Sequence, residues 1–426
     1  MNTKLAEVAS PDQLISNRLI LRIVISYALA FIVFGFLVSS PGELLKGLVQ
    51  IITTRDALIT DYIGVGGMGA AFVNAGLLTC GAVACYRITG AAVSGASIAS
   101  LFLLLGFGLF GKNLLNVWPI VAGVWLYAKF RNEPFAAHIN IAFFGCALAP
   151  IFSEILYSTA IPRRVSIPLA LFTALLLGFI LAPAASQLFK AHAGFNLYNI
   201  GFTAGIIGTL VVALYKSYGF VPDPVMIWTS ENRGVLTGFM AMLFLSMLIT
   251  GLCLDRRSLS QLSTLIKLSG QAPTDFVAIV GLGATMVNMG LCGLIGLAYF
   301  RVIGADLNGP TIGGILTIVG FAAFGKHPLN IVPIMLGVFL GSLAKPWNIT
   351  DPAIVLAALF GTTLAPIAGQ FGWPWGIVAG FLHSSAALTV GFNHAGLNLY
   401  NNGFAAGIVA AVIAPVIIAV KQGRRG

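Results

Sequence analysis

The densest polar element in the apolar part of the chain occurs twice. Residues 192–206 read HAGFNLYNIGFTAGI and residues 394–408 read HAGLNLYNNGFAAGI, with 12 of 15 positions identical. The side chains that can form hydrogen bonds are His192, Asn196, Tyr198 and Asn199 in the first copy, and His394, Asn398, Tyr400 and Asn401 in the second. Because helical residues three apart share a face, each asparagine pair is expected to present its amides in one direction. Amides donate and accept hydrogen bonds, which suits a small, neutral, polar solute; the alternative is that these side chains bond helix ends and pack the copies together.

A second repeated element carries asparagine and aspartate. Residues 60–77 (TDYIGVGGMGAAFVNAGL) and 274–291 (TDFVAIVGLGATMVNMGL) share 9 of 18 positions. Asn74 and Asn288 lie among the glycines, and either bond a neighbouring helix or end a half-helix beside a pore. Asp61 and Asp275 open the same segments, and either cap a helix start or line a vestibule or cation site.

Three charged side chains lie in or beside apolar segments, where charge is costly. Lys112 and Lys326 each follow Phe-Gly at twin positions, where a lysine either extends to the membrane interface or meets an anionic solute. Glu154 lies inside the apolar segment APIFSEIL, and its counterpart in the second copy is the uncharged Gln370. An intramembrane acid is a candidate for coupling solute movement to a cation.

The composition indicates that these residues belong to a membrane protein. Of 426 residues, 58% are hydrophobic and 8% charged, and the mean hydropathy is +0.96. A soluble domain carries about 25% charged residues, so a soluble enzyme, a disulfide scaffold and a disordered protein are excluded. The net charge of +10 comes from basic residues scattered at the ends of apolar runs, which does not indicate nucleic acid. The five cysteines have no metal-ligand spacing, and neither a metal nor a cofactor is expected.

The two copies form an internal duplication. The correspondence holds at an offset of 214 from residue 60 through Lys112 and Lys326, and at 202 around His192 and His394. The offset falls because the first copy has about fourteen extra residues near 158–168. We therefore expect a polar N-terminal tail (1–17), membrane repeat 1 (18–216), a connecting loop (217–233), membrane repeat 2 (234–420) and a basic C-terminal tail (421–426).

Each copy contains about seven apolar segments, which predicts an all-α polytopic membrane protein with about 10–14 membrane segments. In the first copy they lie near 18–39, 61–86, 91–111, 114–129, 138–157, 166–183 and 195–215, and in the second near 234–254, 276–299, 309–325, 329–344, 352–370, 374–390 and 397–419. The junction 112–119 and its twin 326–333 interrupt short segments, which favours re-entrant or broken helices at a binding site over two ordinary spans joined by a turn. An odd number of crossings per copy would invert the second copy. The basic clusters at 18–22 and 255–257 favour that inversion.

The sequence lacks the motifs of an energy-driven or catalytic membrane protein. It contains no nucleotide-binding glycine loop, no HExxH and no recognisable Ser/His/Asp set. We therefore expect no enzyme. The expected partners are a small polar solute and membrane lipids, without nucleic acid, and a homo-oligomer is compatible with the sequence.

Two resemblances agree with this architecture. The whole chain resembles an uncharacterised bacterial inner-membrane family known as a domain of unknown function in two copies, which implies a multi-pass location in the bacterial inner membrane. More loosely, the repeats are similar to those of bacterial urea channels, which have a Tyr/Phe-Asn-Gly helix start and a re-entrant Gly-Leu-Pro-x-Leu-Thr-x-Pro-Phe element. Residues 198–201 and 400–403 look like the first feature, and 111–119 and its twin look like the second. The urea-channel Thr before Pro-Phe is absent here.

These observations predict a passive channel or facilitator for a small polar solute, with a pathway lined by the symmetric Asn, His and Tyr positions. One alternative is an ion-coupled secondary carrier of a small organic anion, in which Lys112 and Lys326 bind the charge and Glu154, Asp61 or Asp275 couples a cation. Another is a membrane subunit without transport activity that binds lipid or a partner complex.

Overall fold

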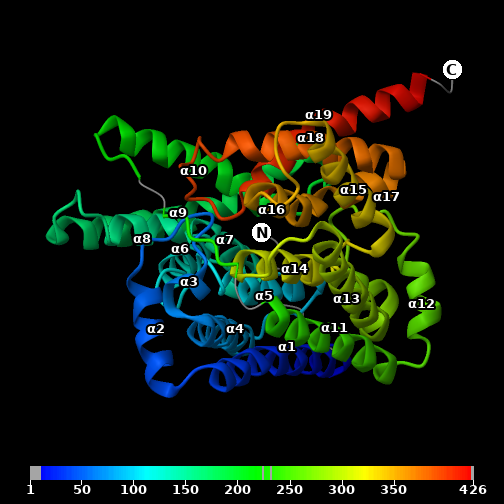
Figure 1. Cartoon of the computed structure of the whole chain (residues 1–426), viewed down its shortest axis with the longest axis horizontal. Helices are drawn as coiled ribbons and strands as arrows, with labels where there is room; N and C mark the ends of the chain where they lie inside the picture. Colours follow the sequence, from blue (N-terminus) through cyan, green and yellow to red (C-terminus); the bar gives the residue numbers. More distant parts are fainter. Residues whose placement is uncertain (1–10, 223–224, 231–232, 424–426) are drawn as a thin grey trace.

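The computed structural model describes residues 11–222, 225–230 and 233–423, which are almost entirely helical (Figure 1). The first repeat contains α1 (Pro11–Val38), α2 (Pro41–Thr53), α3 (Tyr62–Gly66), α4 (Met68–Thr89), α5 (Gly95–Phe107), α6 (Trp118–Phe130), α7 (Ile139–Gly145), α8 (Ala149–Leu156), α9 (Arg163–His192) and α10 (Asn199–Ser217). The second contains α11 (Arg233–Leu254), α12 (Ser258–Leu265), α13 (Phe276–Ile303), α14 (Gly309–Phe321), α15 (Pro328–Ala344), α16 (Pro352–Phe360), α17 (Ala365–Phe371), α18 (Trp373–Val390) and α19 (Asn401–Gly423). Three short 3-10 turns complete the described helices: η1 (Phe135–Ala137), η2 (Cys146–Leu148) and η3 (Gly361–Leu364).

The expected all-α, polytopic fold is confirmed. Nine helical stretches among the described residues are long and apolar enough to cross a membrane, and the shorter apolar helices α5, α14 and α15 add to them. Every apolar segment predicted from the sequence contains a helix. Helices α2 and α12 were not predicted from the sequence, because polar residues interrupt their apolar runs. The chain is therefore a multi-pass membrane protein.

The repeat boundaries differ in detail from those expected. Helix α1 already begins at Pro11, inside the stretch expected as a tail, and α19 continues to Gly423. Residues 1–10 and 424–426 lie outside the described part. Within the connecting segment, Ile227 pairs with Thr60 in an isolated bridge, so this segment is anchored on the first repeat.

Both repeats break at equivalent glycines. Gly67 separates α3 from α4 at φ 84° and ψ 161°, and Gly281 kinks α13 at φ 83° and ψ 164°. Such positive φ values are accessible to glycine without a Cβ clash. A second break in each repeat follows α5 and α14, where a short irregular stretch carrying Lys112 or Lys326 leads into the next helix.

A pseudo-two-fold axis relates the repeats and inverts the second one. Helices α5 and α14 pack antiparallel at the centre (Figure 1): Gly106 lies against Gly313, and Phe102 lies against Gly320 nearer the other ends. The spanning twins α1 and α11 also run antiparallel, because the Phe34 and Phe239 rings stack at 4.2 Å while the Ser246 hydroxyl lies 3.5 Å from the Tyr27 hydroxyl. Equivalent spanning helices that run in opposite directions make an inverted repeat.

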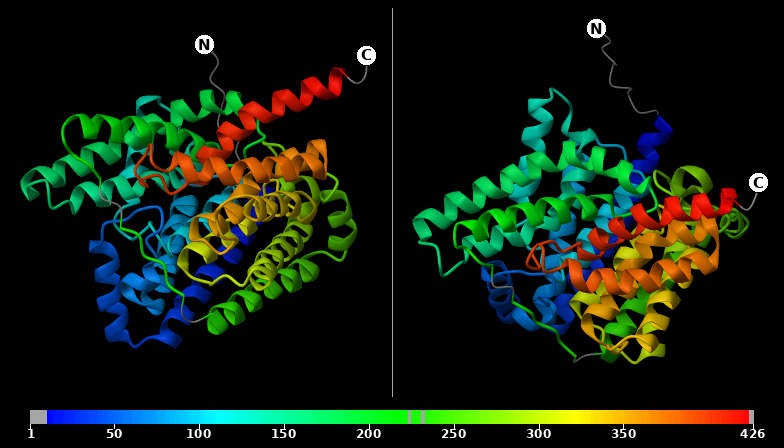
Figure 2. Two further views of the ribbon diagram at one scale, coloured as in Figure 1. Left: turned by 45° about the horizontal axis from the view of Figure 1, so that its top comes forward. Right: turned by 90° about the horizontal axis from the view of Figure 1, so that it is seen from above.

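The repeats also meet through α10 and α19. A Cβ on Gly201 would lie 3.1 Å from the Cα of Gly403, and the reverse distance is the same. This close approach needs glycine on both sides. Figure 2 shows α18 and α19, in orange and red, lying next to each other, with the yellow and orange helices of the second repeat on one side of the molecule and the blue and cyan helices of the first on the other.

Candidate functional site

Two cavities of nearly equal size are exchanged by the pseudo-two-fold. We call them the first vestibule, with a volume of about 470 Å³, and the second vestibule, with about 490 Å³. Their walls contain twin residues: Asn199 and Asn401, Leu197 and Leu399, Ala185 and Ala387, Phe144 and Phe360, and Phe324 and Phe110. The axis inverts the second repeat. Residues that the first vestibule directs toward one side of the membrane therefore have twins that the second vestibule directs toward the other side.

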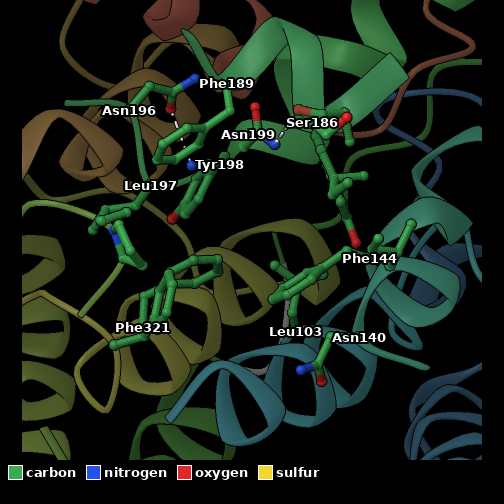
Figure 3. A pocket seen from close by; sticks show the side chains of 18 of the residues that line it. Leu103, Asn140, Phe144, Ser186, Phe189, Asn196, Leu197, Tyr198, Asn199 and Phe321 are labelled. Carbon is green, nitrogen blue, oxygen red and sulfur yellow. Dashed lines mark hydrogen bonds between the residues drawn. The ribbon is translucent and has the colours of Figure 1, made fainter. Parts of the chain in front are cut away.

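Figure 3 shows the first vestibule from close by. Its upper wall carries the predicted polar element, with Asn196, Tyr198 and Asn199, and its lower wall carries Leu103, Asn140, Phe144 and Phe321. Most of the lining is therefore aromatic or aliphatic, with a few amides and the hydroxyls of Ser186, Tyr198 and Tyr400. This composition is typical of small-molecule sites.

The two vestibules are separated by a closed centre. A void of about 10 Å³ lies between them, lined by Leu103, Phe107, Tyr198, Thr317, Phe360 and Tyr400 among others. A water molecule needs roughly 10–15 Å³ measured in this way. Phe107 packs edge-on against Tyr400 at 4.9 Å, and its twin Phe321 packs against Tyr198 at 4.6 Å. The aromatic side chains therefore close the connection between the two vestibules.

Each repeat inserts a lysine behind the tyrosine of the other repeat. The Lys112 Nζ donates to the Tyr400 hydroxyl at 2.5 Å, and the Lys326 Nζ donates to the Tyr198 hydroxyl at 2.5 Å. Both ammonium groups also lie over aromatic faces, 4.7 Å from the Tyr400 centroid and 4.5 Å from the Tyr198 centroid. Both lysines are fully buried. The alternative that these lysines extend to the membrane interface is therefore wrong, because the breaks after α5 and α14 direct them to the centre.

The twin residues Asn74 and Asn288 hold the breaks that carry the lysines. The Asn74 amide donates to the carbonyls of Gly108 and Lys112 at 2.7 and 3.0 Å. The Asn288 amide donates to the carbonyls of Ala322 and Lys326, both at 2.8 Å. Each asparagine satisfies carbonyls that the end of a helix leaves free. In this structure they bond the neighbouring segment rather than line a vestibule.

The expectation that each asparagine pair shares a helical face is wrong. Helices α10 and α19 begin only at Asn199 and Asn401, so Asn196 and Asn398 lie in the preceding turn. The Asn196 amide crosses to the Gly403 carbonyl at 3.0 Å, and Asn398 crosses to the Gly201 carbonyl at 3.4 Å. A buried turn leaves backbone groups unpaired, and these amides satisfy them across the repeat interface.

The two histidines fix the other two asparagines. His192 and Asn199 are joined at 3.0 Å between Nε2 and Oδ1, and His394 and Asn401 at the same distance. The two asparagine amides then donate to the carbonyls of residues 185 and 387, at 3.0 and 2.8 Å. The histidines therefore position the amides of Asn199 and Asn401, which line the vestibules. The same repeated element thus both bonds neighbouring helices and lines the cavities.

The acidic residues at the helix starts are caps, as one of the two interpretations predicted. Asp61 accepts from the backbone of Ile63 at 3.0 Å and of Gly309 at 3.2 Å, and from the Thr229 hydroxyl. Asp275 accepts from the backbone of Ala278 at 3.2 Å. Burial raises the pKa of Asp61 to about 6, although these hydrogen bonds favour its charged form.

Glu154 belongs to a buried network of polar side chains that was not predicted from the sequence. Its carboxylate lies 3.6 Å from the Arg55 guanidinium. Next to it, the fully buried Asp56 accepts from the Tyr62 hydroxyl at 2.8 Å and from the Asn116 amide at 2.9 Å. Burial raises the pKa of Asp56 to about 7, against the lowering effect of its donors. The signal in the sequence was the pair Asn113 and Asn116, three residues apart and directly after Lys112.

The described residues contain no group of three or more His, Cys, Asp or Glu side chains placed to hold a metal ion. Cys146 and Cys292 are buried free thiols.

The fold and the site define an inverted-repeat membrane protein with two twin vestibules and a closed centre. The chain belongs to the DUF1576 family, described as a protein of unknown function, whose profile matches residues 40–217 and 254–419. The two matched stretches begin 214 residues apart and end 202 apart, which are the two offsets of the duplication. No curated protein and no solved structure matches the chain.

Proposed function

We propose that the protein is a passive membrane channel or facilitator for a small polar solute. The observation that carries this proposal is that two vestibules of equal size, exchanged by an inverting axis, meet at one small centre. Such an arrangement gives access from both sides of a membrane to the same constriction. Passage then needs only matched donors and acceptors and a movement of the aromatic side chains.

The direct test is solute flux in proteoliposomes. Urea, glycerol and formamide should cross faster than in protein-free vesicles, at rates independent of a proton or sodium gradient. Accumulation of a solute against its gradient, or flux no faster than in empty vesicles for every solute class tried, would overturn the proposal.

Twin substitutions at the centre connect the flux to this pathway. Tryptophan at Leu103 or Thr317, which both line the central void, should block flux, whereas Leu29→Trp on the exposed face of α1 should not. Phe360→Ala and its twin Phe144→Ala remove parts of the aromatic barrier and should increase flux. A loss of flux can arise from misfolding, but a gain cannot.

The ion-coupled carrier is the second candidate, because the first repeat buries two carboxyl groups, those of Asp56 and Glu154. The twin positions in the second repeat hold the uncharged Gly270 and Gln370. Under that function, an imposed pH gradient should drive uptake, and Glu154→Gln should abolish the driven component. If uptake is independent of the pH gradient in both the wild type and the Glu154→Gln variant, this candidate is excluded.

A further inference from the structure

We infer that the closed centre is an anion site, and that the solute of the proposed pathway is a small monovalent anion. This inference rests on the proposed function and deepens it. Lys112 with Tyr400 and Lys326 with Tyr198 form two pairs, each joining one repeat to the other across the axis. We call them the lysine–tyrosine pairs.

The first argument concerns charge. Both lysines are fully buried, and neither forms an ion pair with any carboxylate in the part of the chain that the structure describes. Burial without a counter-charge disfavours the charged form of each lysine and lowers its pKa, even when the side chain lies over aromatic rings. An anion that enters between the tyrosines supplies that counter-charge.

The second argument concerns hydrogen-bond capacity. An ammonium group has three donors and no acceptor. Among the described residues, Lys112 finds one acceptor, the Tyr400 hydroxyl, and Lys326 finds two, the Tyr198 hydroxyl at 2.5 Å and the Thr362 hydroxyl at 2.8 Å. The centre therefore holds a surplus of donors. It suits a solute that only accepts, such as a carboxylate, better than an amide that must also donate.

The third argument concerns position and size. Tyr198 lines the first vestibule, and both tyrosines border the central void, so a solute meets the hydroxyls while the ammonium groups remain behind them. Lys112 accepts no hydrogen bond, so its bond to Tyr400 leaves the tyrosine proton free to point at the solute. The void of about 10 Å³ is too small for formate as it stands, so the aromatic side chains move apart when the anion enters.

The two pairs are not identical. Thr362, which accepts from Lys326, corresponds to Cys146 in the first repeat, whose thiol instead lies 3.3 Å from the Ala142 carbonyl. The Lys112 side of the centre is therefore poorer in acceptors. Removal of Lys112 should affect anion passage more than removal of Lys326.

The test compares formate with formamide, which have nearly the same size but differ in charge and in donors. Exchange of labelled formate into vesicles loaded with unlabelled formate moves no net charge, and is measured well above the pKa of formic acid. Formate should exchange about tenfold faster than formamide crosses, relative to empty vesicles. Lys112→Met should reduce formate exchange by about tenfold and change formamide flux by less than about twofold.

A milder variant and a control protect the result from misfolding. Tyr400→Phe keeps the ring and removes only the hydroxyl. It should reduce formate exchange in a protein that still folds, with a somewhat lower melting temperature because Lys112 loses its acceptor. Lys46→Met, an exposed lysine on α2 that lines neither vestibule, should leave the ratio of formate to formamide unchanged.

The outcomes separate the two proposals. If formamide crosses through the protein as fast as formate and Lys112→Met leaves the ratio unchanged, the anion site is overturned while the channel stands. If neither solute crosses faster than in empty vesicles, both are overturned.

Discussion

The two repeats stabilise the same junction in different ways. In the first repeat, the buried carboxylate of Asp56 accepts from Tyr62, Asn113 and Asn116. At the twin positions the second repeat has Gly270, Phe276, His327 and Asn330. There the backbone takes the place of the side chains: a Cβ on Gly270 would lie 1.9 Å from the Gly325 carbonyl, and one on Gly369 would lie 2.2 Å from the Ser269 carbonyl.

The difference shows which part of the duplicated fold is constrained. The lysine–tyrosine bonds, the His–Asn bonds and the amide bonds of Asn74 and Asn288 recur in both halves. The junction behind them keeps the twin asparagines Asn116 and Asn330, and around these it has diverged from an acidic network to close backbone packing. The symmetric part lines the vestibules and the centre or holds the segments that carry the lysines, and the asymmetric part lies behind it.

The largest expected effect is in the second repeat. Gly270→Ala places a Cβ 1.9 Å from a backbone oxygen at φ +73°, so backbone has to move. We expect a loss of more than about 4 kcal/mol, seen as little folded protein in detergent. Gly90→Ala, at φ +65° with open space around the Cβ, is the matched control and should cost about 1 kcal/mol. Equal stability of the two variants would contradict the backbone packing described for Gly270.

The next effect is in the first repeat. Asp56→Ala leaves the Tyr62 hydroxyl and the Asn113 and Asn116 amides without their shared acceptor. We expect a loss of about 3 kcal/mol, measured as a lower melting temperature in detergent. Asp255→Ala, near the surface, should cost less than about 1 kcal/mol. A variant as stable as the wild type would show that the network does not support the fold.

A twin pair sharpens the comparison further. Asn116 donates to Asp56, Ser153 and the Gly111 carbonyl, whereas Asn330 donates only to the Gly325 carbonyl. Asn116→Ala should therefore cost about 1–2 kcal/mol more than Asn330→Ala. In an Asp56→Ala background the difference should shrink, because the shared contact is already lost. An undiminished difference would place its cause outside the network.

The last effect is on the pH dependence of stability. The pKa of Asp56 is about 7 in the folded protein and near 3.8 in the unfolded chain, so the folded state keeps a proton that the unfolded state has released. Stability should therefore fall as pH rises from about 4 to 7 and then level off. A drop of roughly 2–6 °C in melting temperature is expected. Asp56→Asn should flatten the slope, and an unchanged slope would assign it to other groups.

The fold was largely predictable from the sequence because the duplication and the apolar segments are strong signals. The break near Lys112 was visible as polar residues between two short segments, whereas Gly67 lies inside the segment 61–86, which was expected to be continuous. Helices α2 and α12 were not visible in the sequence, because amphipathic helices of 13 and 8 residues lack a continuous apolar run.

The site was predictable only in part. Repetition identified the lysines and tyrosines, but their reciprocal pairing depends on the axis, which no local pattern encodes. The predicted shared face of Asn196 and Asn199 was wrong, because Asn196 precedes the helix that begins at Asn199. Asp56 was missed because it has no twin, and the repeat was the main guide to the site.

The antiparallel course of α1 and α11 has an evolutionary consequence. A half-length polypeptide that inserts into the membrane in both orientations would assemble, as a dual-topology dimer, the same two vestibules and both lysine–tyrosine pairs. Fusion of two such halves fixes one orientation for each and releases them from having identical sequences. The difference between Asp56 and its twin Gly270 is an example of the divergence that two halves with separate sequences permit.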